Sequence, residues 1–278
     1  MSRRARAAPT ARRPPREILA AMTTPEVTIQ HTADQVAIVE IHRAPNNFLD
    51  VALIAALGDA FEEVDRSSAR VIVLCSEGKN FSAGADLTGA SSAAPISADG
   101  AADFYREAIR LFANATPVIA CVQGAAVGAG AGLALAADLR VASPSTRFVF
   151  PFSRLGFHQG FGITATLPPL VGSSRALDLL YTSRSCTGEE AMRIRLCDRL
   201  VPAEQIREQA RALAAEIAAS APLAVASIRR SLRDSLVSAV RTATDEEFTA
   251  QLRLRATNDH REALRAAAAG EEPRFNAT

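Results

Sequence analysis

Two continuous apolar runs, each followed by a turn of very small residues, constrain the fold of this chain most. The runs span residues 70–76 (RVIVLCS) and 117–124 (PVIACVQG). Apolar runs without alternation, flanked by turn residues, are typical of strands that are covered on both faces. Helical patterns at 101–115 and 130–137 lie between and after them. Because strand and helix alternate, the sequence predicts an α/β fold with covered sheets.

Further elements extend this pattern in both directions. Strands are predicted at 27–30 and 35–42, and an amphipathic helix at 48–66 has Asp50 near its start. Residues 138–143 and 147–150 read as another strand pair. After residue 164 the strand signal disappears, and helices are predicted at 175–182, 188–196, 203–220, 222–235 and 239–256. Residues 88–101 lack apolar periodicity, so they are expected to form a loop, and such loops often border ligand sites.

Length and charge exclude several classes of protein. A chain of 278 residues with 48% hydrophobic content can bury the core of one large α/β domain. Residues 1–21 carry six arginines and one glutamate, so the remaining body has a formal charge of −4 against +1 for the whole chain. This balance, with no aromatic residue in the basic tail, predicts no nucleic-acid partner. Residues 1–22 are expected to be a disordered Arg/Pro-rich extension, although a transit peptide or a true start at Met22 stays open.

The four cysteines, Cys75, Cys121, Cys186 and Cys197, have no metal-like spacing. They are expected to be reduced, buried thiols, with no metal site. The sequence shows no signal peptide and no apolar run of about 18 residues. We therefore expect a cytoplasmic protein that does not enter a membrane.

Two turns of small residues, NFSAGADL at 80–87 and GAAVGAGAG at 124–132, each follow a predicted strand. Small side chains let a ligand approach the backbone, and a helix start leaves N–H groups unpaired beside a positive dipole. The glycine spacing does not fit a phosphate loop, and no lysine follows it. The better hypothesis is an oxyanion hole with one N–H from each turn. The alternative is that Gly128 to Gly132 only let the helix pack closely.

These turns, with their spacing, resemble the enoyl-CoA hydratase/isomerase family, the crotonases. The resemblance is carried by RAPNNFLD, RVIVLCSEGKNFSAGADL, TPVIACVQGAAVGAGAGLALAADLRVAS, RFVFPFSRLGFHQGFGITATLPPLVG, RALDLLYTSRSCTGEEAMRIRLCDRLVP and APLAVASIRRSL, and it runs from about residue 28 to residue 275. It implies a ββα spiral core at 23–220 and a helical C-terminal region at 221–278 that forms homotrimers or homohexamers. It also implies an acyl-CoA substrate, with coenzyme A as part of the substrate and no separate cofactor.

The resemblance places the thioester carbonyl between the backbone N–H groups of Ala85 and Ala129. The resemblance also implies that residues of both turns contact the adenine and the acyl group of the acyl-CoA substrate. Arg43 would approach the phosphates of its coenzyme A. The remaining residues implied as substrate-binding are Ala83, Gly84, Asp86, Leu87, Gly128, Gly132 and Phe152. Asp86 also reads as a helix N-cap rather than an acid.

The departures from the family pattern concern the reaction. Gly132 and Phe152 stand where hydratases have their two glutamates, and Gly160 stands where some relatives have an aspartate. Because hydration needs a base for water and an acid for the carbanion, ordinary hydration is predicted to be weak. His158 is the candidate acid or base, since imidazole titrates near neutral pH, unless it only shapes its loop. Tyr105 is expected either to line the acyl tunnel or to pack in the core.

Two functional hypotheses remain. The first is an enzyme that acts on an acyl-CoA thioester through an enolate, for which decarboxylation or carbon–carbon cleavage fits the missing acids better than hydration or isomerisation. The second is a non-catalytic acyl-CoA binder or a partner in mixed oligomers.

The C-terminal region also departs from the family pattern. Ala267 and Gly270 replace the phenylalanine and lysine with which the family often contacts CoA, so those contacts are expected to be weaker or different.

Overall fold

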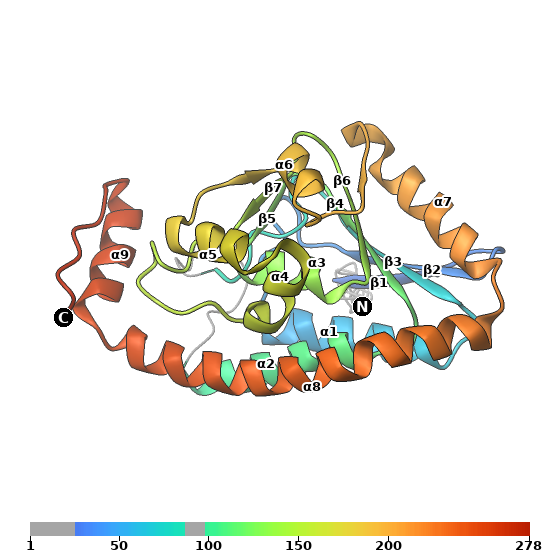
Figure 1. Cartoon of the computed structure of the whole chain (residues 1–278), viewed down its shortest axis with the longest axis horizontal. Coiled ribbons are helices and arrows are strands. Elements are labelled where there is room, and N and C mark those ends of the chain that lie inside the picture. The colour runs from blue at the N-terminus through green and yellow to red at the C-terminus, as the bar shows by residue number, and fades with distance from the viewer. Residues whose placement is uncertain (1–25, 87–97) are drawn as a thin grey trace, which may run out of the picture.

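The computed structural model describes residues 26–86 and 98–278 (Figure 1). The expectations for the extension at 1–22, for the part of the loop at 88–97 and for Leu87 lie outside these residues. The expected loop is shorter at its other end, because helix α2 begins at Ala98.

Two sheets form the centre of the molecule. The larger one has the strand order β1-β2-β3-β4-β6-β9, in which β1 is antiparallel to β2 and the other pairs are parallel. Its strands are β1 (Val27–His31), β2 (Val36–Ile41), β3 (Val71–Ser76), β4 (Val118–Val122), β6 (Leu139–Ala142) and β9 (Arg199–Leu200). The smaller sheet has the order β5-β7-β8. Its strands are β5 (Ala125–Val127), β7 (Arg147–Val149) and β8 (Cys186–Thr187).

Helices surround the sheets and make up most of the C-terminal half (Figure 1). They are α1 (Val51–Asp65), α2 (Ala98–Ala113), α3 (Ala129–Ala136), α4 (Ile163–Val171), α5 (Ser173–Thr182), α6 (Gly188–Arg193), the 3-10 turn η1 (Ala203–Gln205), α7 (Ile206–Ala218), α8 (Pro222–Arg255) and α9 (Asn258–Ala269). Asp50 caps α1, since its side chain accepts a hydrogen bond from the backbone N–H of Leu53.

The larger sheet is covered on both faces, as its continuous apolar runs predict. In β3, Val71, Val73 and Cys75 pack in one cluster with residues of α7. Ile72 and Leu74 point to the opposite face, into the larger core that includes α1, α2 and α3. Alternate residues of one strand thus enter two different cores, which explains why no polar residue interrupts the run.

The two strands predicted at 138–143 and 147–150 are present as β6 and β7, but their prediction as a pair is wrong. β6 joins the larger sheet beside β4, whereas β7 joins the smaller sheet beside β5. Each turn of the spiral contributes one segment to each sheet. The parallel bridges Ser82–Ala126 and Leu49–Ala85 continue the pairing of the smaller sheet into the earlier turns of the spiral. The chain therefore forms the ββα spiral that the resemblance implies.

The C-terminal helices differ from the sequence prediction in three ways. The predicted break between 235 and 239 is absent, and α8 is one helix of 34 residues, with no proline or glycine after Pro222. Helix α4 was not predicted, because it contains Pro168 and Pro169. Helix α9 and the two-residue strands β8 and β9 were also missed.

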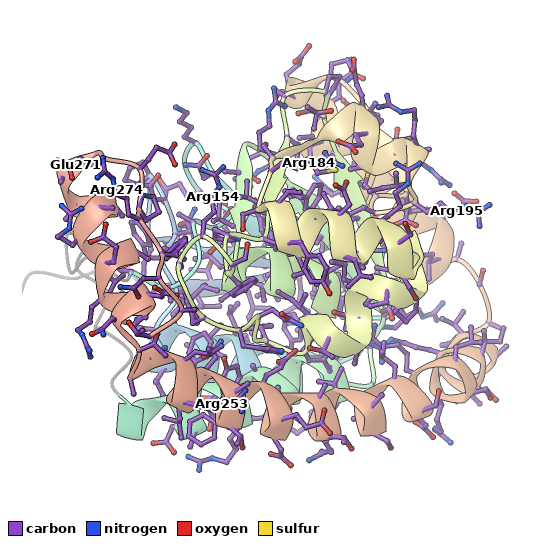
Figure 2. All side chains as sticks on the ribbon, turned by 60° about the vertical axis from the view of Figure 1, so that its left-hand side comes forward. Arg154, Arg184, Arg195, Arg253, Glu271 and Arg274 are labelled. Carbon is purple, nitrogen blue, oxygen red and sulfur yellow. The ribbon has the colours of Figure 1, made fainter. Side chains whose placement is uncertain are left out.

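Helix α8 runs along one side of the molecule, over α2 and α4, and α9 turns away from its end (Figure 1). Charged side chains cover the outside, among them Arg253 on α8 and Glu271 and Arg274 beside α9 (Figure 2). Within the described residues, no single helix is long and apolar enough to cross a membrane. The pair Ala203–Ala218 and Pro222–Arg255, bent by 107°, meets that length and composition only when taken together.

Candidate functional site

The two turns of small residues, far apart in sequence, lie side by side. The backbone N–H of Ser82 donates to the carbonyl of Ala125 at 3.1 Å, and the N–H of Val127 donates to the carbonyl of Ser82 at 2.9 Å. The Asn80 side chain accepts from the N–H of Ala125 at 3.0 Å. These bonds join the ends of β3 and β4, because neighbouring parallel strands end at the same edge of a sheet.

Glycines allow this close approach. Gly84 has φ +80°, and a Cβ there would lie 2.4 Å from the carbonyl oxygen of Val127 and 3.3 Å from the nitrogen of Ala129. Gly128 has φ +53°, and a Cβ there would meet only ordinary contacts at 3.9 Å from Phe152 and Pro151, so its backbone conformation is what requires glycine. A Cβ on Gly130 would lie 2.3 Å from the Ser82 carbonyl. The glycines are therefore consistent with both hypotheses from the sequence. Gly130 allows the close packing of the helix, and Gly128 shapes the turn.

Ala85 and Ala129, from the two turns, line the same cavity. No hydrogen bond from the backbone N–H of either residue is found to any residue in 26–86 or 98–278. Ala129 is the first residue of α3, where a helix leaves its N–H groups unpaired and concentrates positive potential. The oxyanion hole that the sequence predicts at these two residues stays a prediction.

The cavity has a volume of about 110 Å³ and is lined by both turns, α2, residues 151–161 and the C-terminal part of α8. Its walls are mainly apolar and include the rings of Phe104, Phe152, Phe157 and Phe161. The longer polar side chains on its surface are Tyr105, Gln251 and Arg255, and the Arg255 guanidinium lies 5.9 Å from the centre of the Phe157 ring. Among the described residues, no aspartate or glutamate lines the cavity.

Other side chains fill the space at two of the three positions where relatives carry acids. A Cβ on Gly132 would lie 2.7 Å from the Cβ of Phe161, and a Cβ on Gly160 would lie 2.1 Å from the hydroxyl of Tyr105. Phe152, at the third position, lines the cavity as expected. Gly132 is not among the residues that line the cavity, because Phe161 covers it, and its contact with substrate stays a prediction.

His158, the candidate acid or base, is not among the residues that line the cavity. Its Nδ1 lies 2.9 Å from the carbonyl oxygen of Gln159, and its own carbonyl accepts a hydrogen bond from Gln251 at 2.8 Å. The residue is half-buried and shapes its loop, which was the alternative hypothesis.

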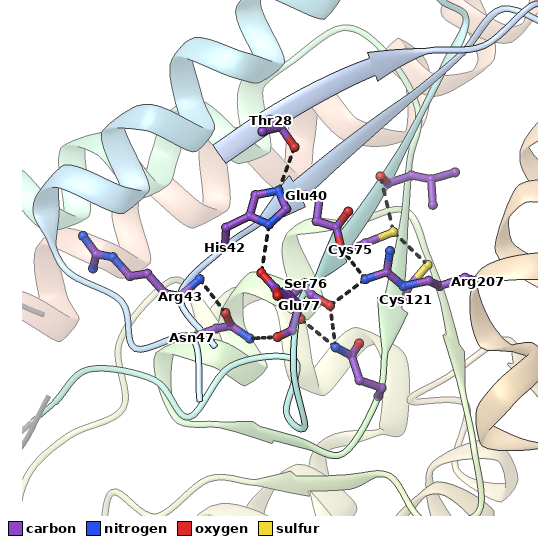
Figure 3. A network of polar contacts seen from close by, with 12 residues as sticks. Thr28, Glu40, His42, Arg43, Asn47, Cys75, Ser76, Glu77, Cys121 and Arg207 are labelled. Atoms are coloured by element: carbon purple, nitrogen blue, oxygen red, sulfur yellow. Dashed lines mark hydrogen bonds and ion pairs between the residues drawn. The ribbon is translucent and has the colours of Figure 1, made fainter. Parts of the chain in front are cut away.

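The backbone N–H of Arg43 donates to the side chain of Asn47 at 3.1 Å (Figure 3), and two acidic side chains hold its guanidinium. It pairs with Glu26 at 2.6 Å and with Asp50 at 2.8 Å. Burial would lower the pKa of Arg43, but the bonds to these two carboxylates outweigh it and raise the pKa. Asn47 fixes the same loop by donating to the carbonyls of Glu77 and Asn80 at 2.7 and 2.8 Å. Contact of Arg43 with CoA phosphates stays a prediction.

Ala83 and Gly84 line the cavity as expected, whereas Asp86 is buried and does not. The expectation that Asp86 caps a helix concerns the residues directly after it, which lie outside the described residues. All four cysteines are free and buried, as predicted. In the part of the chain that the structure describes, no group of three or more histidine, cysteine or acidic residues could hold a metal ion.

Sequence reasoning missed the contribution of α8 to the cavity. Gln251 and Arg255 are four residues apart and therefore share one helix face. Such a polar pair in a charged helix reads as a solvated surface, and nothing in the sequence indicates that this turn of the helix covers a cavity. Phe161, which has φ +63°, was missed for the same reason.

These features define an α/β spiral with an apolar cavity between two strand-to-helix turns. Residues 31–277 match the family described as Enoyl-CoA hydratase/isomerase. The chain therefore belongs to the enoyl-CoA hydratase/isomerase family, which confirms the resemblance seen in the sequence.

Relatives and solved structures agree with this assignment. A carnitinyl-CoA dehydratase of Salmonella arizonae is 34% identical over 204 residues, which are 72% of this chain and 78% of that protein. The glyoxysomal fatty acid beta-oxidation multifunctional protein MFP-a of Cucumis sativus is 33% identical over 195 residues, 66% of this chain but only 26% of that protein. A crystal structure of an enoyl-CoA hydratase/isomerase from Pseudoalteromonas atlantica T6c matches with a TM-score of 0.80 and 25% identity, covering 90% of this chain and 100% of that chain.

Proposed function

We propose that the protein binds an acyl-CoA thioester with its carbonyl oxygen between the N–H groups of Ala85 and Ala129, and catalyses its decarboxylation. The carrying observation is that Ala85 and Ala129, from different turns, line one cavity, and that no hydrogen bond from either backbone N–H is found to a described residue. Each such donor stabilises a developing oxyanion by roughly 2.7 to 4 kcal/mol. Coenzyme A enters as part of the substrate.

The lack of carboxylates on the described cavity lining favours carbon–carbon cleavage over hydration. Hydration needs a base to activate water. In a malonyl-type thioester the substrate supplies its own carboxylate. The electrons of the breaking carbon–carbon bond move to the thioester, carbon dioxide leaves, and the resulting enolate oxygen is stabilised by Ala85 and Ala129. A proton from water then adds to the α-carbon. This sequence assigns no step to His158.

A direct test compares malonyl-CoA, methylmalonyl-CoA and crotonyl-CoA as substrates, with products separated by chromatography. We expect acetyl-CoA or propionyl-CoA to form at least tenfold faster than crotonyl-CoA is hydrated. Gly84→Ala should lower this rate by about 10², because its Cβ would push against the Val127 carbonyl and displace the Ala85 donor. Gly172→Ala is a matched control, since Gly172 has a similar φ of +83° and nothing within 4 Å.

The second hypothesis, a non-catalytic acyl-CoA binder, is favoured by the same absence of carboxylates on the described lining. It predicts that CoA esters bind and that none of the three is converted. Failure of the wild-type protein to bind any of them would remove both proposals.

We also propose that the chain assembles with copies of itself through its C-terminal region. Large apolar side chains on α8 support this, because Leu223, Ile228 and Leu232 are 86%, 61% and 72% exposed in the single chain. Native mass spectrometry distinguishes a trimer or hexamer from a monomer, and a monomer would remove this proposal.

A further inference from the structure

The phenol of Tyr105 is the neutral polar group that α2 brings to the cavity. Tyr105 is 8% exposed and lines the cavity, with its ring packed edge-on against Phe104 and Phe248. The sequence left open whether this side chain lines the acyl tunnel or packs in the core, and the structure shows that it packs in the core and also lines the cavity. Its aromatic ring supplies the packing, so its hydroxyl needs a separate explanation.

The hydroxyl occupies the space that a side chain at position 160 would need. A Cβ on Gly160 would lie 2.1 Å from the Tyr105 oxygen and 2.8 Å from the Gln251 amide nitrogen. Gly160 has no positive φ, so the need for glycine here is spatial. The phenol of α2 and the amide of α8 therefore stand together where some relatives are expected to carry an aspartate.

The hydrogen bonds around this pair leave the phenol proton available. The Gln251 amide nitrogen donates to the His158 carbonyl at 2.8 Å, and a carbonyl can only accept, so this nitrogen is correctly placed. Of the Gln251 side-chain atoms, the amide nitrogen is the one that lies beside the phenol oxygen at position 160. Because an amide N–H can only donate, this arrangement leaves the phenol O–H for a ligand. Burial, together with the nearby charge of Glu247, raises the pKa of Tyr105, so the proton stays on the oxygen.

We propose that the Tyr105 hydroxyl donates a hydrogen bond to an oxygen atom carried by the acyl chain. The cavity would thereby select acyl thioesters with such an oxygen over saturated ones of the same length. This inference rests on the proposed function, because it requires that the cavity holds the acyl group. A saturated chain would leave the buried O–H unpaired among phenylalanine rings, and an unpaired buried donor is costly.

The test compares 3-oxobutyryl-CoA with butyryl-CoA, which differ by one ketone oxygen. Because the two esters carry the same charge, their charge interaction with Arg255 is the same. Isothermal titration gives the Kd of each. For the wild-type protein we expect about tenfold tighter binding of the 3-oxo ester. Tyr105→Phe should abolish this preference and leave the Kd of butyryl-CoA within about twofold. Tyr181→Phe, at the other tyrosine of the chain, is 73% exposed and should keep the preference.

A second variant moves the phenol without removing it. Gly160→Ala places a methyl group against the Tyr105 hydroxyl, so it should also abolish the preference while the phenol is still present. Equal weakening of both esters in Tyr105→Phe would show a packing role and overturn the inference. Equal binding of both esters by the wild-type protein would overturn it as well, while the proposed function would stand. Binding of neither ester would remove the proposed function and the inference with it.

Discussion

Helix α8 crosses two buried regions that differ in how their polar groups are paired. Near its start, Arg229 and Arg233 reach Asp138, with nitrogen-to-oxygen distances of 2.9 and 3.2 Å. Near its end, Gln251 and Arg255 reach a cavity on whose described lining there is no acid. The same helix therefore meets a charged cluster at one end and an aromatic cavity with a neutral phenol at the other.

The charged cluster is closed by partners from several elements. Asp138 also accepts from the backbone N–H of Val118 at 2.8 Å, and Arg233 donates to the carbonyl of Ala136 at 2.8 Å. Arg229 donates to the Asn114 side chain at 3.0 Å. Burial nevertheless lowers the pKa of Arg233, which shows that the site is poorly solvated. Such a cluster fixes α8 on the core but has few groups left for a ligand.

In the cavity, by contrast, no hydrogen bond is found from the backbone N–H groups of Ala85 and Ala129 to any described residue. The hydroxyl of Tyr105 lies there beside the amide nitrogen of Gln251. Among the described residues, the buried charged cluster leaves only the Nε of Arg233 without a hydrogen-bond partner. This contrast indicates that buried polar groups serve attachment where nearly all are paired, and ligand binding where protons remain to be donated.

The largest expected effect comes from opening the charged cluster. Asp138→Ala leaves two buried guanidinium groups without their carboxylate, and breaking such a cluster costs about 3 to 5 kcal/mol. Urea denaturation measures the loss in the free energy of unfolding. Asp234→Ala, an exposed position on the same helix, should change it by less than about 0.5 kcal/mol. Equal effects of the two variants would contradict the role given to the cluster.

The reverse experiment adds a charge beside the neutral cavity. Gly132→Glu collides with Phe161, and we expect a loss of about 2 to 4 kcal/mol in the free energy of unfolding, with no gain in crotonyl-CoA hydration. Phe161→Ala in the same chain should return part of the stability by making room. Ala267→Glu, on the exposed face of α9, is the control. A stable, hydrating single variant would show that Phe161 does not exclude a carboxylate.

A smaller effect concerns the ionisation of Tyr105. Its pKa is raised by burial and by Glu247, so it contributes stability that is full below about pH 10, where a free phenol titrates, and is lost as the pH rises further. In Tyr181→Phe, Tyr105 is the only tyrosine left. Its absorbance near 295 nm should stay flat through pH 10 and rise when urea unfolds the chain at the same pH. A rise at pH 10 in the folded protein would contradict the burial of the phenol.

The smallest effect is expected at His158. Since it does not line the cavity, His158→Ala should change kcat/KM for decarboxylation by less than about threefold, or about 0.6 kcal/mol. His31→Ala, at an exposed position, serves as the control. A loss near 10² specific to His158 would restore it as the general acid or base.

Local sequence determined the elements whose signal is local. Continuous apolar runs fixed β3 and β4 as covered strands, Asp50 marked the start of α1, and small residues located both turns. These features depend on neighbours within a few residues, so they can be read without the fold. The family, and with it the spiral, also followed from collinear motifs.

Tertiary structure decided which distant residues meet. β6 and β7 are separated by four residues yet belong to different sheets, because each pairs with the preceding pass of the spiral. The phenol of Tyr105 reaches Gly160, and Phe161 covers Gly132, only because α2 and the loop before α4 converge on α3. Sequence spacing carries no information about such contacts, since side chains at the cavity are brought together by packing rather than by order along the chain.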